Sequence, residues 1–147
     1  MRVDQSNFED KLQDYQVFDF GTFYFFDGVI VGELNEGITF TYKEAKKFID
    51  VALEYYGPDK NVVYVSNRVN SYSVKPTDWV KINNTLQTLI AVGVVHYSTF
   101  SKSIFNIEKL FYKKPFKGFE SLEDAFVWAK HIVHRDRLAV IHSGRDK

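Results

Sequence analysis

The chain has 147 residues, of which 45% are hydrophobic and 26% charged, a length and balance typical of one folded domain. Nineteen basic residues offset nineteen acidic ones, so no net charge favours a nucleic acid or an anionic membrane as partner. The chain contains no cysteine, which excludes disulfides, thiolate catalysis and Cys-ligated metals.

The N-terminal residues carry charges throughout and have no apolar signal segment. The longest apolar run, Leu89 to Val95, is far shorter than the roughly 20 residues that span a membrane. We therefore expect a cytoplasmic protein without membrane contact. Residues 1–14 are expected to form an N-terminal extension, 15–133 the domain, and 134–147 a C-terminal tail whose last residues, "SGRDK", fray.

A β-hairpin opens the predicted domain. The segments "YQVFDFGTFYFF" and "VIVGEL" flank Asp27-Gly28, a dipeptide that favours a type I′ turn. Gly21, inside the first segment, predicts a bulge or bend. Aromatic residues occupy both faces of this strand, which is therefore central or covered by a partner. We expect a homodimer formed through this hairpin or the neighbouring edge strand.

A helix with clear ends follows the hairpin. Thr41 and Glu44 form a T-x-x-E capping box, and Gly57-Pro58 ends the helix. The next segment, Asn61 to Ser66, is a continuous apolar strand of the kind that is buried on both faces of a parallel sheet.

The remaining elements continue the alternation of helices and strands. They are a short helix from Pro76 to about Leu86, a second buried strand "LIAVGVVHY", a helix from Phe100 to Phe111, a short strand "FKGFE", and a last helix capped by Ser121 and Asp124. This order predicts an α/β domain with one mixed, mostly parallel sheet, led by the hairpin and packed against about four helices.

Three segments carry a resemblance to a known family: "GELNEGITFTYKEA", "VYVSNRVNSYSVKP" and "FYKKPFKGFESLEDAFVWA". Over roughly residues 15–129 the chain resembles the SpoIIAA-like group of STAS/SEC14-type domains. The resemblance implies a SpoIIAA-like (STAS-type) fold and a binding or regulatory role. In the anti-sigma-factor antagonists a phosphorylatable serine begins the helix after the third strand. Ser71 and Ser73 occupy that loop here, but the Asp-x-Ser-Gly motif is absent.

Polar residues follow three strands of the predicted sheet, which end near Leu34, Ser66 and Tyr97. If these strands are parallel neighbours, their carboxyl ends share one edge, where open α/β sheets bind ligands. We expect that edge to form a ligand or interaction site and to bring together Glu33, Glu36, Arg68, Asn70, Ser71, Tyr72, Ser73, His96 and Ser98.

Each of these residues has a structural alternative. Arg68 grips a carboxylate or phosphate, or forms an ion pair with Glu33 or Glu36, and we favour the ion pair. Tyr72 stacks on a ligand or, as we favour, packs into the core. Ser71 and Ser73 are phosphosites or hydrogen-bond the loop backbone.

The function predicted is a non-catalytic binding or regulatory module for a protein partner or a small anionic ligand. One alternative is a small-molecule enzyme with His96 and Glu36 as acid and base. The other is a purely structural homodimer. The sequence contains no nucleophile elbow, glycine-rich phosphate loop or metal-ligand triad, so no catalytic residue, cofactor or metal is predicted.

Overall fold

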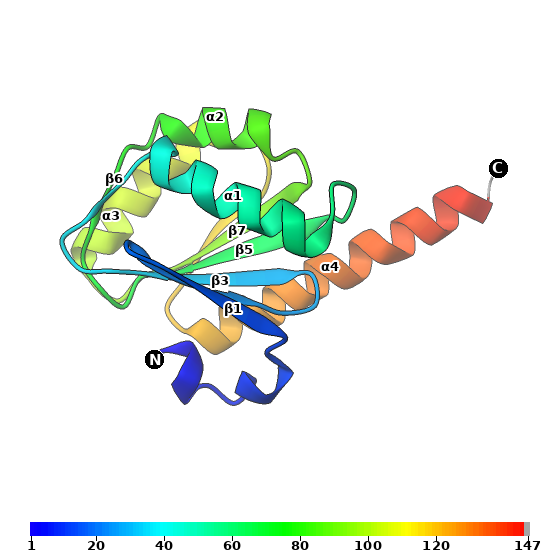
Figure 1. Cartoon of the computed structure of the whole chain (residues 1–147), viewed down its shortest axis with the longest axis horizontal. Helices are drawn as coiled ribbons and strands as arrows, with labels where there is room; N and C mark the ends of the chain where they lie inside the picture. The colour runs from blue at the N-terminus through cyan, green and yellow to red at the C-terminus, as the bar shows by residue number, and fades with distance from the viewer. Residues whose placement is uncertain (146–147) are drawn as a thin grey trace.

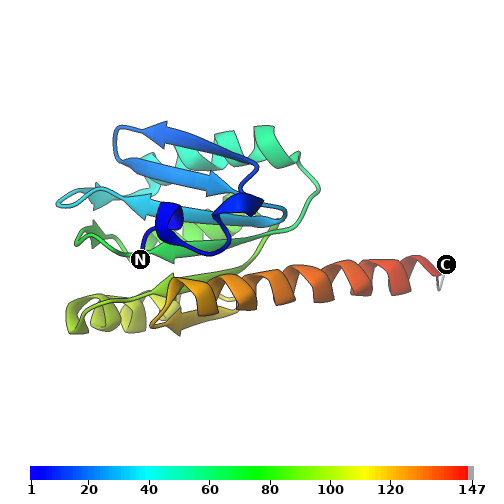
Figure 2. The ribbon, with the colours of Figure 1, turned by 90° about the horizontal axis from the view of Figure 1, so that it is seen from below.

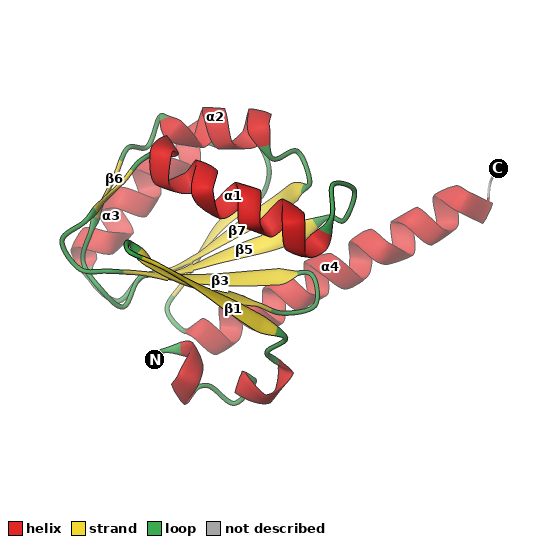
Figure 3. Ribbon diagram, viewed as in Figure 1, coloured by secondary structure: helices red, strands yellow, loops and turns green. Residues whose placement is uncertain are grey.

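A computed structural model describes residues 1–145 as a six-stranded sheet with helices on both faces (Figure 1 and Figure 3). The strands lie in the order β1-β2-β3-β5-β7-β8. Their bounds are Asp14–Phe18 (β1), Gly21–Phe25 (β2), Val29–Leu34 (β3), Val62–Asn67 (β5), Leu89–Val95 (β7) and Phe116–Phe119 (β8). A second, two-stranded parallel sheet joins β4 (Thr39–Phe40) to β6 (Ser73–Val74). The predicted α/β class and mixed, mostly parallel sheet are confirmed.

Four α-helices connect or follow these strands: α1 (Tyr42–Tyr56), α2 (Asp78–Thr85), α3 (Thr99–Glu108) and α4 (Leu122–Arg145). Short 3₁₀ helices lie at Val3–Gln5 (η1), Glu9–Lys11 (η2) and Lys109–Phe111 (η3). The Thr41–Glu44 capping box begins α1 and Gly57, with φ 87°, ends it, as predicted. No helix of residues 1–145 has the length and apolar character needed to cross a membrane.

The predicted hairpin is a three-stranded antiparallel unit. Residues Asp19 and Phe20 form a turn between β1 and β2, and Gly21 begins β2 opposite Phe18. Of the bulge or bend predicted at Gly21, the structure therefore has the bend, and the predicted first strand is two strands. Between β2 and β3, Gly28 has φ 74° while no non-glycine residue described has positive φ. The turn is therefore not type I′, which requires positive φ at Asp27 as well.

The strands β3, β5, β7 and β8 are parallel neighbours, each linked to the next by one of α1, α2 and α3. The carboxyl ends of β3, β5 and β7 therefore share one edge, as the sequence predicted. Since successive right-handed crossovers in one direction keep their helices on one face, α1, α2 and α3 cover the same side of the sheet. The helix α4 contacts the other side, as Figure 2 shows.

Aromatic rings fill the core beneath α1. Phe23 stacks on Phe48 of α1 with ring centroids 4.2 Å apart, and Phe25 stacks on Tyr55 at 4.9 Å. The rings on this face of the hairpin are thus buried by the chain's own helix and need no partner to cover them.

Both predicted terminal segments are structured. Phe8 of the N-terminal segment is buried and stacks on Phe126 of α4, with centroids 3.9 Å apart. The helix α4 continues through residues 134–145, which were expected to form a tail. Arg137 in that extension donates to Asp27 of the β2–β3 turn at 2.7 Å. Within "SGRDK", residues 143–145 belong to the helix, and 146–147 lie outside the described residues.

Candidate functional site

A buried ion pair lies behind the carboxyl edge of the sheet. Arg68, just after β5, donates through Nη2 to Oε1 of Glu108 at 2.7 Å and through Nη1 to Oε2 at 2.5 Å. Arg68 is 6% exposed and Glu108 is fully buried. Trp79 of α2 donates its indole N–H to the same carboxylate at 2.9 Å. The pair joins the end of β5 to α2 and α3.

Glu108, and neither Glu33 nor Glu36, is therefore the partner of Arg68, so the predicted partners are wrong. The sequence carried a signal for Glu108: it follows the buried Phe105 by three residues and so occupies the buried face of α3. A carboxylate at a core position needs a buried cation.

Arg68 is also tied to its own strand. Its Nε donates to the Ser66 hydroxyl at 3.1 Å, which is hydrogen-bonded to the Tyr72 hydroxyl at 3.0 Å. Its guanidinium lies 5.7 Å from the centre of the Tyr72 ring, within cation–π range. Burial alone would lower the pKa of Arg68, but Tyr72 and Glu108 raise it above its ordinary value. Arg68 stays charged, and Glu108 neutralises that charge.

Glu33 belongs to a second polar cluster, on the side of the sheet that faces the N-terminal segment. Its Oε2 accepts hydrogen bonds from Asn67 Nδ2 at 2.6 Å and from the Val3 N–H at 3.0 Å. The Tyr97 hydroxyl donates to Asn67 Oδ1 at 2.6 Å, and Asn67 Nδ2 also donates to the Met1 carbonyl at 2.9 Å. Asn67, Tyr97 and this contact with the N-terminal segment were not predicted from the sequence.

Replacing Glu33 with glutamine is expected to make stability less dependent on pH. Burial raises the pKa of Glu33 above its ordinary value of 4.5. The folded protein then holds this proton more tightly than the unfolded chain, so stability falls as the pH rises from the ordinary value toward the folded one. Glu33→Gln removes this titration. Its free energy of unfolding, relative to wild type, should increase as the pH rises from about 4 to 7.

Urea unfolding at several pH values measures this difference. Glu36→Gln provides the control, because Glu36 is an exposed carboxylate in the turn after β3. A difference between Glu33→Gln and wild type that stays constant across the pH range would contradict the assignment.

Asn70, Ser71 and Ser73, which were predicted for the site, join the loop after β5 to the loop after β3. Asn70 donates through Nδ2 to the Leu34 carbonyl at 2.9 Å and accepts from Arg2 at 3.2 Å. The Ser71 carbonyl accepts the Gly37 N–H at 2.8 Å, and the Ser73 N–H donates to the carbonyl of Ile38 at 3.0 Å. Both serine side chains are exposed, and their phosphorylation stays a prediction.

His96 and Ser98 lie just after the end of β7. His96 is half-buried, and its backbone N–H donates to the Phe119 carbonyl of β8 at 3.0 Å. The Ser98 hydroxyl accepts the Ser101 N–H at 3.1 Å and caps α3. Within residues 1–145, no hydrogen bond or ion pair joins His96 to Glu36, and no group of three or more His, Cys, Asp or Glu residues is suited to hold a metal ion.

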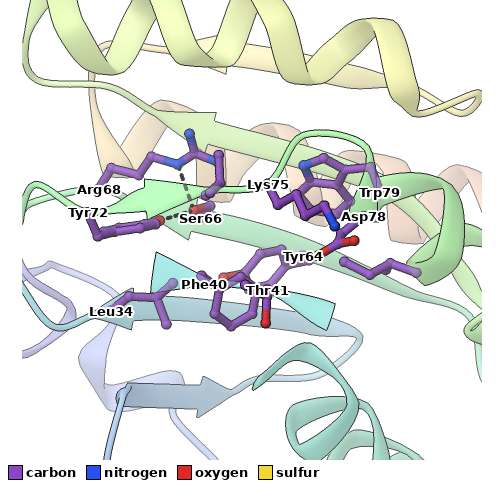
Figure 4. A pocket seen from close by; sticks show the side chains of 12 residues that line it. Leu34, Phe40, Thr41, Tyr64, Ser66, Arg68, Tyr72, Lys75, Asp78 and Trp79 are labelled. Carbon is purple, nitrogen blue, oxygen red and sulfur yellow. Dashed lines mark hydrogen bonds between the residues drawn. The ribbon is translucent and has the colours of Figure 1, made fainter. Parts of the chain in front are cut away.

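A hollow lies between the end of β5, α2 and the β4–β6 sheet, as Figure 4 shows. The Arg68–Ser66–Tyr72 chain forms one side, and Trp79 with Asp78 the other. Counting its open mouth, the hollow encloses about 360 Å³, of which about 20 Å³ is open to the centre of a water molecule. The full lining is Leu34, Phe40, Thr41, Tyr64, Ser66, Arg68, Tyr72, Val74, Lys75, Asp78, Trp79 and Ile82.

Tyr64 places a hydroxyl group in the wall that this hollow shares with its apolar neighbour. The residue is 5% exposed, and its hydroxyl lies close to that of Ser66, which is also bonded to Arg68 and Tyr72. Burial raises the pKa of Tyr64 above its ordinary value, so the hydroxyl is a neutral donor and acceptor.

An apolar hollow lies directly behind the first and shares Phe40, Tyr64, Trp79 and Ile82 with it. Together the two form a space between helices and sheet with an aromatic wall and a few hydrogen-bonding groups near its mouth, the usual character of a small-molecule site.

Comparisons of the chain with models of known protein families, with curated proteins and with solved structures found no match, so the resemblance to the SpoIIAA-like group stays a prediction.

Proposed function

We propose that the chain is a non-catalytic binding domain for a small, uncharged molecule that is largely apolar and carries one hydrogen-bonding group. The ligand lies in the hollow lined by Tyr64 and Trp79, with its polar group on the Tyr64 hydroxyl. The observation that carries the proposal is the pair of adjoining hollows, which combines an aromatic wall with a few hydrogen-bonding groups, the Tyr64 hydroxyl among them.

The charges around the hollow favour an uncharged ligand over the anionic one expected from the sequence. The Arg68 charge is neutralised by Glu108, and the Asp78 carboxylate accepts the Tyr42 N–H at 2.7 Å. Lys75 lies exposed at the mouth. A negative ligand would therefore meet no free buried cation in this hollow.

The mouth must widen to admit anything larger than water, because the space open to a water centre is only about 20 Å³. The roof over the mouth includes Phe40 of β4 and Val74 of β6, two strands of two residues each. Such a short pairing opens at little free-energy cost compared with the six-stranded sheet. We propose that this separation of β4 from β6 serves the regulatory role that the family resemblance implies.

The binding test uses two probes of similar size, 4-fluorophenol and fluorobenzene, observed by ¹⁹F NMR. Wild-type protein is expected to bind 4-fluorophenol about two- to tenfold more tightly than fluorobenzene, the ratio that one hydrogen bond gives. Tyr64→Phe should abolish this preference while still binding fluorobenzene.

Tyr55→Phe is the matched control, because the exposed Tyr55 bonds Gln13 outside the hollow. It should keep the wild-type preference. If neither probe binds, or if Tyr64→Phe retains the preference, the proposed site is wrong.

A further inference from the structure

The strand β1 is an unprotected edge of the sheet. It pairs with β2 on one side and with no other strand among the described residues, and it lies at the edge remote from α4 (Figure 2). The opposite edge, β8, follows Pro115 and carries Lys117, two residue types that discourage pairing with another chain. The strand β1 contains neither proline nor lysine.

The hydrogen bonds of β2 show which backbone groups of β1 point outward. The Phe25 carbonyl accepts the Gln13 N–H at 2.9 Å, whereas the Phe26 N–H donates to the Val29 carbonyl at 2.8 Å. The backbone N–H and C=O groups of Phe25 therefore point toward β1, and those of Phe26 point toward β3. This direction alternates from residue to residue along an antiparallel strand.

The same alternation applies to β1. Asp14 and Gln16 lie opposite Phe25 and Phe23, so their N–H and C=O groups point toward β2. Those of Tyr15 and Val17 point away from the sheet. The side chains of Tyr15 and Val17 are 58% and 61% exposed and share one face of the strand. The edge thus presents free backbone groups beside two exposed apolar side chains.

We propose that β1 pairs antiparallel with β1 of a second copy of this chain, in a register centred on Gln16. Tyr15 then lies opposite Val17 of the second copy, and these outward-facing residues exchange backbone hydrogen bonds on both sides of the two-fold axis. Sliding one β1 strand by one residue along the other is excluded. It would place residues whose backbone groups point away from the sheet opposite residues whose backbone groups point toward β2. Shifted toward the C-terminus, it also sets Asp14 against Asp19 of the second copy.

The α1 face of β1 also suits this register. An open hollow there is lined by Asp14, Gln16, Phe25, Val51 and Tyr55, among others. In the proposed pairing Phe18 of the second copy lies opposite Asp14, at the rim of this hollow, and the two Gln16 side chains lie side by side. The surface is separate from the ligand hollow behind the carboxyl edge, so this interface is independent of the proposed function.

The short ladder predicts a weak dimer. β1 has five residues, and a ladder of that length buries less than the ~1,200–2,000 Å² typical of a stable interface. Sedimentation equilibrium between about 10 μM and 1 mM should therefore show a monomer–dimer equilibrium that depends on concentration.

Val17→Lys should raise the dimer dissociation constant at least about tenfold, because a desolvated charge would replace an apolar contact. Val127→Lys is the matched control: Val127 is 68% exposed on α4, away from β1, and its variant should dimerise like wild type. A wild type that is monomeric at 1 mM, or a dimer that Val17→Lys leaves unchanged, would overturn the interface.

Cross-linking tests the register, since the chain has no cysteine of its own. The two Gln16 residues would form a non-hydrogen-bonded pair with Cα atoms about 4.5 Å apart, close enough for a disulfide. Gln16→Cys should therefore cross-link readily under mild oxidation. In Asp14→Cys the two thiols would be offset by four residues, about 13 Å, and should not cross-link. Equal cross-linking of both variants would contradict the register.

Discussion

Replacing Arg68 with alanine is expected to lower the free energy of unfolding by about 3–5 kcal/mol, because it leaves a buried carboxylate without its cation. Glu108 is fully buried and receives both guanidinium nitrogens and the Trp79 indole. Urea unfolding measures the change. A loss of this size assigns Arg68 the role of joining the end of β5 to α2 and α3.

Arg137→Ala provides a matched control. Arg137 also donates through both guanidinium nitrogens to one carboxylate, that of Asp27, but their side chains are 45% and 43% exposed. Exposed pairs contribute about 0–1 kcal/mol, so this variant should lose little stability. The double variant Arg68→Met/Glu108→Leu should recover most of the loss, since an apolar pair of similar size leaves no buried charge. Equal losses for Arg68→Ala and Arg137→Ala would contradict this account.

Replacing Gly32 with alanine is expected to destabilise the protein by about 1–3 kcal/mol, through overpacking in the middle of the sheet. A methyl group at Gly32 would overlap the Tyr64 hydroxyl and come within 2.9 Å of the Phe23 ring. Both rings are buried, so neither moves aside freely. Thermal or urea unfolding measures the effect.

Two further variants separate overpacking from a general effect of losing a glycine in a strand. Gly93→Ala in β7 should cost less, because its nearest contact is Trp128 at 3.2 Å. Adding Tyr64→Phe to Gly32→Ala removes the atom that overlaps most closely, so the double variant should be more stable than Gly32→Ala alone. If Tyr64→Phe brings no recovery, the strain does not arise at the hydroxyl.

The sequence by itself determined the elements whose signals are local. The Thr41–Glu44 capping box and Gly57 mark the two ends of α1. The continuous apolar runs of β5 and β7 predicted that both strands are buried. The alternation of helices and strands gave the parallel order of β3, β5 and β7, because short crossover connections permit few other arrangements. The position of the polar edge follows from that order.

Only the tertiary structure decided which polar side chains meet at that edge. Arg68 and Glu108 are 40 residues apart, and Val3 and Glu33 are 30 apart. No periodic pattern encodes such pairs: they depend on how α3 and the N-terminal segment pack against the sheet. Burial then selects among the possible partners, since a carboxylate inside the core must find its cation or donors there. The same packing enclosed the Tyr64 hydroxyl and left β1 as a free edge, so both proposals rest on three-dimensional contacts that strand periodicity alone does not contain.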